Sequence, residues 1–107
     1  MALRVIVPER SYFTKAPALN GVYYVDSEVD FGTSAPLDES KTQVFLQGFF
    51  MAYPSRHHVA RVRAGAIPLS VSGSVVKYQT QLILDDSSGN HFDGSKSWVQ
   101  PVIVTET

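Results

Sequence analysis

The chain of 107 residues contains no cysteine. Disulfides, thiolate nucleophiles and cysteine-based zinc sites are therefore excluded. Charge is scarce as well, because 18% of the residues are charged, against the ~25% usual in soluble domains, and the net charge is −1. Such a balance predicts no general attraction to nucleic acid or membrane. The low charged fraction favours a surface that partners cover in part.

Targeting and catalytic motifs are missing too. No apolar run approaches the ~20 residues of a membrane-spanning helix, and Pro8, Glu9 and Arg10 interrupt the short apolar run that precedes them. We therefore expect no secretion signal, and a cytoplasmic or virion location. The sequence lacks the G-x-S-x-G serine motif and any Gly-rich phosphate loop, so it predicts no catalytic residue, no cofactor and no enzymatic reaction.

The dominant pattern is the two-residue period of β-strands. Segment 75–84 shows it best, since Val76, Tyr78 and Leu82 fall on one side while Lys77 and Gln79 fall on the other. Turn-forming residues separate further strand-like segments. The predicted strands are 3–8, 22–31, 41–53, 58–71, 75–84 and 98–107, with turns or loops at 19–21, 32–40, 72–74 and 85–97. This pattern predicts one all-β domain over 1–107: an antiparallel sandwich or barrel, jelly-roll or Greek-key-like, with about six to eight short strands.

Segment 41–53 is apolar on both of its sides. A helix capped by Asp38 is an alternative, but the aromatic and β-branched residues and the central Gly48 favour a strand. As a strand, it carries two apolar sets with Gln47 as the exception. One side holds Val44, Leu46, Phe50 and Ala52, and the other holds Phe45, Phe49, Met51 and Tyr53. Residues 102–104 lack alternation in the same way.

Each sheet of a small sandwich has only one inner face, so the second apolar side of these strands needs a cover. Segment 9–20, a second subunit or a neighbour's edge strand can provide one. We favour a homo-oligomer, and hence a non-enzymatic structural or assembly protein that contacts its own copies and other subunits, such as a small virion or phage component of capsid, decoration or tail type. The predicted interface comprises Phe45, Phe49, Met51, Tyr53, Val102, Ile103 and Val104.

Two charged patterns are candidates for contacts. A basic stripe in segment 56–63 suits phosphate or carboxylate groups, or else forms cross-strand ion pairs on a solvated face. Its residues are Arg56, His57, Arg61 and Arg63. The carboxylates Asp26, Glu28 and Asp30 share one side of a strand. Solvent can hydrate them, a basic stripe can form ion pairs with them, or a calcium ion can bind them.

The polar loop 85–97 is a candidate ligand site. Its groups can bind sugar hydroxyls, with an aromatic ring for the sugar face. The residues are Asp85, Asp86, Asn90, His91, Asp93 and Trp98. The alternative function is therefore a ligand-binding β-module for carbohydrate or nucleic acid. No metal site is predicted, because the adjacent His57 and His58 point to opposite sides of a strand and His91 is distant in sequence.

Overall fold

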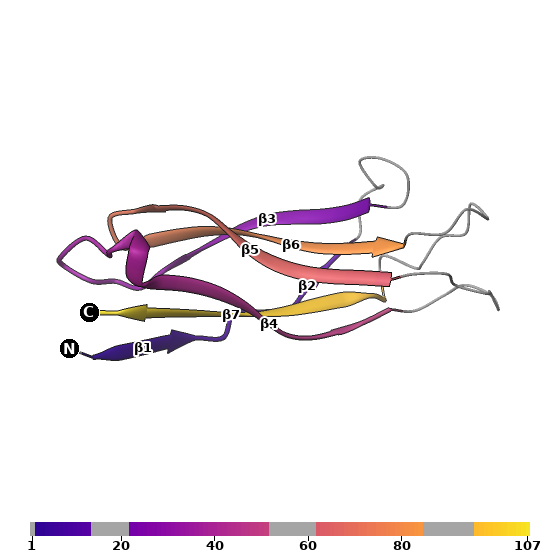
Figure 1. Ribbon diagram of the computed structural model, residues 1–107, viewed down its shortest axis with the longest axis horizontal. Coiled ribbons are helices and arrows are strands. Elements are labelled where there is room, and N and C mark those ends of the chain that lie inside the picture. Colours follow the sequence, from indigo (N-terminus) through magenta and orange to yellow (C-terminus); the bar gives the residue numbers. More distant parts are fainter. Residues whose placement is uncertain (1, 14–21, 52–61, 85–95) are drawn as a thin grey trace.

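A computed structural model describes residues 2–13, 22–51, 62–84 and 96–107. Within these residues the chain forms two antiparallel β-sheets packed face to face (Figure 1), which confirms the predicted sandwich. The elements are β1 (Leu3–Ile6), β2 (Ser11–Tyr12), β3 (Val22–Asp30), the 3-10 helix η1 (Glu39–Lys41), β4 (Thr42–Phe50), β5 (Val62–Ser72), β6 (Val75–Leu84) and β7 (Trp98–Glu106).

The first sheet, sheet A, is built around β7. Strand β4 pairs along one edge of β7, while β1 and β2 follow one another along the other edge. The unexpected strand β2 continues the line of β1 after a break at residues 7–10, where proline interrupts the pairing. At this break the Gln100 side-chain amide donates to the Pro8 carbonyl at 2.7 Å. Sheet A is therefore three strands wide.

The second sheet, sheet B, has the order β3–β6–β5. A two-residue turn joins β5 to β6, as the sequence predicts for 72–74, and Gly73 occupies its first central position with φ +59°. Strand β5 runs unbroken past Gly65 and Pro68. Its pairing with β6 shifts by one residue between Pro68 and Ser70, so a bulge at an edge strand accommodates the proline.

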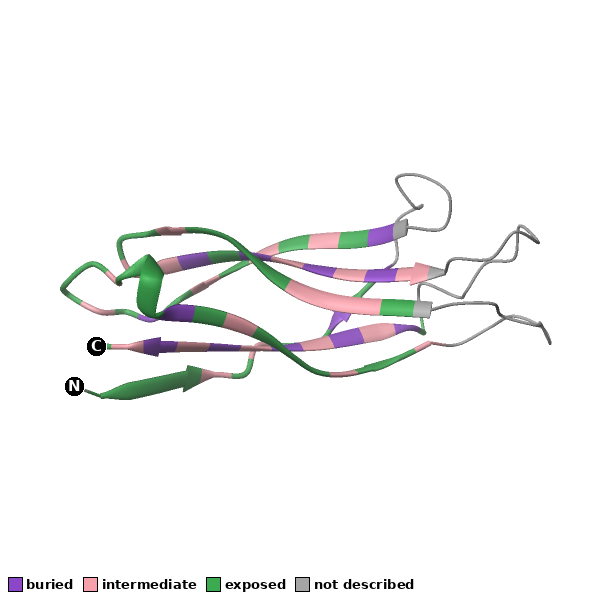
Figure 2. Ribbon diagram, viewed as in Figure 1, coloured by how far each residue is buried: buried purple, intermediate pink, exposed green. Residues whose placement is uncertain are grey.

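The core lies between the two sheets. Strand β6 contributes Val76, Tyr78 and Leu82, and strand β7 contributes Val99 and Ile103. Buried and partly exposed residues alternate along the whole of β7, as Figure 2 shows. Every second side chain of β7 therefore points into the sandwich, and the intervening ones point to the outer side of sheet A.

Strand β4 contains a β-bulge that corrects the predicted faces. The structure confirms a strand here, but its pairing with β7 skips Gln47. The extra residue reverses the alternation, so Phe49 lies opposite the buried Val99 and Phe50 lies opposite Trp98. Phe49 and Phe50 thus exchange the sides that strict alternation assigns to them.

Candidate interaction surface

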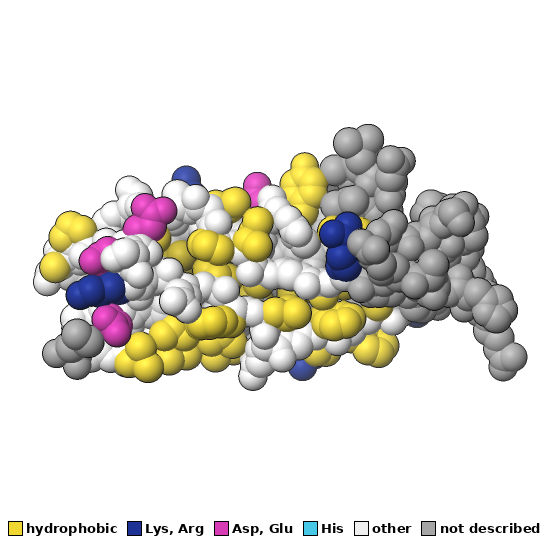
Figure 3. All heavy atoms as spheres, viewed as in Figure 1, with side chains coloured by type: hydrophobic (Ala, Val, Ile, Leu, Met, Phe, Trp, Pro, Cys, Tyr) yellow, Lys and Arg dark blue, Asp and Glu magenta, His cyan; other side chains and the backbone are white. Residues whose placement is uncertain are grey.

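The outer side of sheet A carries a set of large apolar side chains, which we name the apolar face; the outward Gln43, Gly48 and Gln100 lie among them. They share this side because directly opposed residues of an antiparallel pair point the same way. The apolar face consists of Leu3, Val5, Tyr12, Phe45, Phe50, Trp98, Val102 and Val104. Five of the eight are exposed, by 45–67%, and the other three on the central strand are half-buried. Figure 3 shows part of this surface as hydrophobic side chains gathered over β1 and β4.

The size of the apolar face follows from strand geometry. It spans three strands and the nine residues of β7. With ~4.8 Å between strands and ~3.4 Å per residue, its flat footprint is about 400 Å². Monomeric soluble proteins rarely expose one apolar patch larger than ~300–600 Å². The apolar face therefore lies in the range where patches commonly have a binding role.

Aromatic rings occupy one end of the apolar face. Phe50 stacks near Trp98 with ring centroids 6.3 Å apart and an interplanar angle of 24°. Tyr12 lies opposite Trp98 from the other neighbouring strand. The Arg10 guanidinium carbon sits 3.9 Å from the centroid of the Trp98 ring, a cation–π contact that fixes a positive charge at this end.

The structure divides the predicted interface residues between two sides of sheet A. Phe45, Val102 and Val104 lie on the apolar face. Ile103 is a correction: it is fully buried in the core, because β7 alternates regularly and its neighbours on both sides point outward. Met51 packs against the core, and Phe49 is on the inner side of β4 although it remains half-exposed. Tyr53 lies outside the described residues.

Sequence reasoning missed five members of the apolar face. Leu3, Val5, Tyr12, Phe50 and Trp98 come from four strands that are distant along the chain. The sequence of 3–8 contained a signal for a second apolar side on this strand, since Leu3, Val5 and Val7 share one side and Ile6 lies on the other. Nothing local indicated that this segment would extend the same surface as Phe45.

Of the predicted ligand residues only Arg63 and Trp98 are described, and they lie at one end of the sandwich on opposite outer sides. Arg56, His57 and Arg61 lie outside the described residues, as do Asp85, Asp86, Asn90, His91 and Asp93. Arg63 is exposed near the start of β5, on the outer side of sheet B. Trp98 opens β7. Figure 1 shows that β4 and β6 end, and β5 and β7 begin, at the same end of the molecule.

The outer side of sheet B carries several charged and amide side chains, together with the exposed Tyr24, Ile67 and Leu69. Asp26 accepts a hydrogen bond from the Gln79 side-chain amide at 2.8 Å, and Glu28 lies opposite Lys77. Asp30 accepts from the Ser74 hydroxyl at 2.5 Å and from the Gly32 amide at 2.8 Å. These hydrogen bonds lower the pKa of Asp30 below its usual value, and the bond from Ser74 has the larger effect. Among the described residues, neutral donors therefore bind Asp26 and Asp30, and Lys77 lies opposite Glu28.

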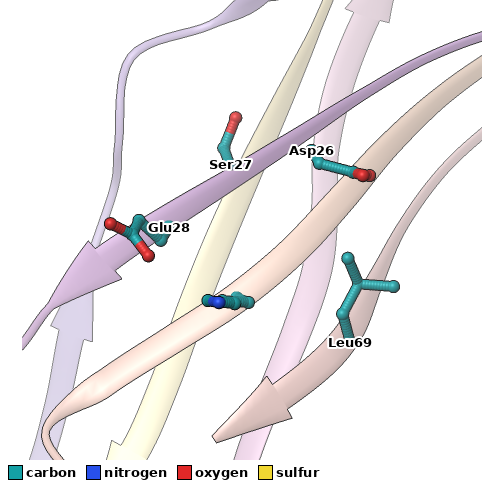
Figure 4. Close-up of a pocket in the computed structure, with 5 residues that line it drawn as sticks. Asp26, Ser27, Glu28 and Leu69 are labelled. Carbon is teal, nitrogen blue, oxygen red and sulfur yellow. The ribbon is translucent and has the colours of Figure 1, made fainter. Parts of the chain in front are cut away.

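A shallow hollow on sheet B carries no recognisable chemistry. It is lined by Asp26, Ser27, Glu28, Leu69 and Lys77, and Figure 4 shows the β3 residues and Leu69 around it. In the described segments, no three or more His, Asp or Glu side chains gather in a way that holds a metal ion. The apolar face is therefore the stronger candidate for function.

The chain matches no protein-family model, no curated protein and no solved structure. Among the residues that the structure describes, no helix has the length and apolar character needed to cross a membrane.

Proposed function

We propose that the protein is a non-enzymatic structural subunit that associates with copies of itself through the apolar face. The observation that supports this is the exposure of large apolar side chains on three adjacent strands, outside the core. The footprint of about 400 Å² also includes Gln43, Gln100 and Glu106, so covering its apolar part contributes at most about 10 kcal/mol per copy at ~25 cal/mol per Å². That gross value must offset an association cost of ~4–15 kcal/mol, so two copies burying their faces together can form a stable pair.

The described part of the chain does not cover the apolar face by itself. Segment 9–20 was one predicted cover; of its described residues, Phe13 is buried in the core and Tyr12 is itself a member of the face, while residues 14–20 lie outside the described residues. The outer side of sheet B is mixed, because exposed carboxylates and Lys77 lie there beside exposed Tyr24, Ile67 and Leu69. The larger apolar set on the outer side of sheet A supports a partner on that side.

The mass in solution tests this proposal. A single chain has a mass of 11.8 kDa, and light scattering over a range of concentrations should give a multiple of it. Val102→Glu places a charge at the centre of the apolar face and should dissociate the assembly. Ile67→Glu, at an exposed apolar residue on the outer side of sheet B, is the matched control and should leave the mass unchanged. A native protein that stays at 11.8 kDa throughout contradicts the proposal.

A narrower form of the proposal is a virion or phage component of capsid, decoration or tail type. The scarcity of charge and the absence of a catalytic motif support it, together with a surface suited to packing against further subunits. Electron microscopy of the purified protein tests it. Regular rings, tubes or shells are expected at high concentration, whereas small dimers alone contradict the narrower form.

A second candidate function is ligand binding at the aromatic end of the apolar face. The supporting observation is that Tyr12 and Phe50 are half-exposed beside Trp98 and Arg10, an arrangement that suits sugar rings or unpaired bases. A glycan array and mixed-sequence oligonucleotides at low and high salt test it. Tyr12→Ala should weaken any such binding, and binding to nucleic acid should fall steeply with salt. No binding in either assay rejects this function.

A further inference from the structure

The two ends of the apolar face carry opposite charges. Glu106 lies on the outer side of sheet A beside Leu3, at the end of β7. Arg10 lies at the other end, over the Trp98 ring at the start of β7. Among the described residues neither Glu106 nor Arg10 forms an ion pair, and the Arg10 guanidinium lies over the ring of Trp98. Each end therefore presents a charge that has no ionic partner in the part of the chain that the structure describes.

The centre of the apolar face is midway between these charges. Val102 is four residues from Trp98 and four from Glu106, and Phe45 lies beside it on β4. Consider a second copy packed on the face and related by a twofold axis at Val102. If the β7 strands run in opposite directions, the Glu106 end of each copy lies over the Arg10 end of the other, while Phe45 and Val102 meet their own counterparts at the centre.

The opposite arrangement is disfavoured by charge. If the two β7 strands run in the same direction, Glu106 meets Glu106 and Arg10 meets Arg10. Like charges placed together across an interface cost several kcal/mol and exclude wrong partners and registers. Packed sheets keep their strand directions within ~30° of one another, so the antiparallel arrangement retains nearly the full length of the face.

We propose that the partner of the apolar face is a second copy of this chain, packed antiparallel, with Arg10 of each copy against Glu106 of the other. This inference rests on the proposed self-association and adds its geometry. The contact is isologous: one surface meets itself, and each ionic contact occurs twice. The apolar centre supplies most of the binding free energy, while the two charged ends set direction and register.

Charge reversal tests the pairing. Arg10→Glu alone and Glu106→Arg alone should each weaken self-association about tenfold or more, because each change places two like-charge contacts in the pair. A mixture of the two variants should restore tight pairing, since each contact then joins opposite charges again. Native mass spectrometry distinguishes the mixed pair from the two parent pairs by mass, and light scattering gives the dissociation constants.

Matched variants and the mixture separate the possible outcomes. Arg63→Glu and Glu28→Arg, on the outer side of sheet B, should leave the dissociation constant unchanged. Arg10→Glu also removes the contact with Trp98, but the mixture retains that loss, so recovery in the mixture isolates the ionic contact. If the native protein is a monomer, the proposed function itself fails. If it is an oligomer and the single variants have no effect, or the mixture does not recover, the antiparallel pairing is wrong while self-association stands.

Discussion

A buried hydroxyl relay between β4 and β7 allows a quantitative prediction. The hydroxyl oxygens of Thr42 and Thr105 are 2.7 Å apart, and both side chains are buried. Thr42 also donates to the Asp38 carbonyl at 2.8 Å. Because a hydroxyl has one proton, Thr105 must be the donor to Thr42. The relay therefore runs from Thr105 through Thr42 to Asp38, whose side chain caps η1.

This direction makes the two threonines unequal. Thr105→Val removes one hydrogen bond and leaves no buried donor without an acceptor, so we expect a loss of about 1 kcal/mol in the free energy of unfolding. Thr42→Val removes the bond to Asp38 and also leaves the fully buried Thr105 hydroxyl without its acceptor, so we expect a loss of about 2–3 kcal/mol. The double variant lacks the orphaned hydroxyl, and its expected loss is about 1–2 kcal/mol.

The double variant should therefore be more stable than Thr42→Val alone. Urea unfolding followed by the fluorescence of Trp98, the single tryptophan, measures all four proteins at one protomer concentration. A loss in the double variant equal to the sum of the single losses means that the hydroxyls do not interact. Equal losses for the two single variants refute the assigned direction of the relay.

Three further predictions concern the sheets. Val102→Ala should weaken self-association and leave the free energy of unfolding nearly unchanged, because Val102 is outside the core. Ile103→Ala should lower the free energy of unfolding by about 2–5 kcal/mol, because Ile103 is in the core. Equal effects of the two variants on self-association and on unfolding contradict the assigned faces. Deleting Gln47 should cost less than ~1 kcal/mol, because every other pair of β4 and β7 keeps its partner; loss of the folded protein in circular dichroism contradicts this. The lowered pKa of Asp30 means that its carboxylate stabilises the fold above the unfolded value of ~3.9, and that this stabilisation is lost as pH falls through the lower folded value. Asp30→Asn should therefore flatten the acid side of the stability profile, measured by urea unfolding at a series of pH values, and an unchanged profile rejects this role.

The outer sides of the two sheets differ in the side chains that they expose to solvent. Sheet B places carboxylates, amides and Lys77 outward, and its exposed apolar side chains Tyr24, Ile67 and Leu69 lie among these polar groups. Sheet A places valine, leucine and aromatic rings outward on all three of its strands. Both sheets contribute an inner side to the same core, and the apolar residues on the outer side of sheet A take no part in that core. Their exposure is the physical basis of the proposed self-association.

Local pattern in the sequence was sufficient for most of the strands and for one turn. Residues 75–84 alternate strictly, and the side that holds Val76 and Leu82 is the buried side. The turn at 72–74 follows from glycine, which adopts positive φ at little cost. The excess of apolar residues in 43–53 and 102–104 also predicted that these strands have a second apolar side, and Phe45, Val102 and Val104 lie on one such side of sheet A.

Only the tertiary structure decided which apolar side chains point outward and what lies beside them. The sequence of β7 is apolar on both sides, so its period does not distinguish Ile103 from its neighbours; the opposing sheet does, by burying one side. The bulge at Gln47 depends on pairing with a strand about fifty residues away, and it exchanges Phe49 with Phe50. The union of Leu3, Tyr12, Phe45 and Trp98 in one surface is likewise a result of strand order. Strand order is set by non-local pairing, which no short stretch of sequence specifies.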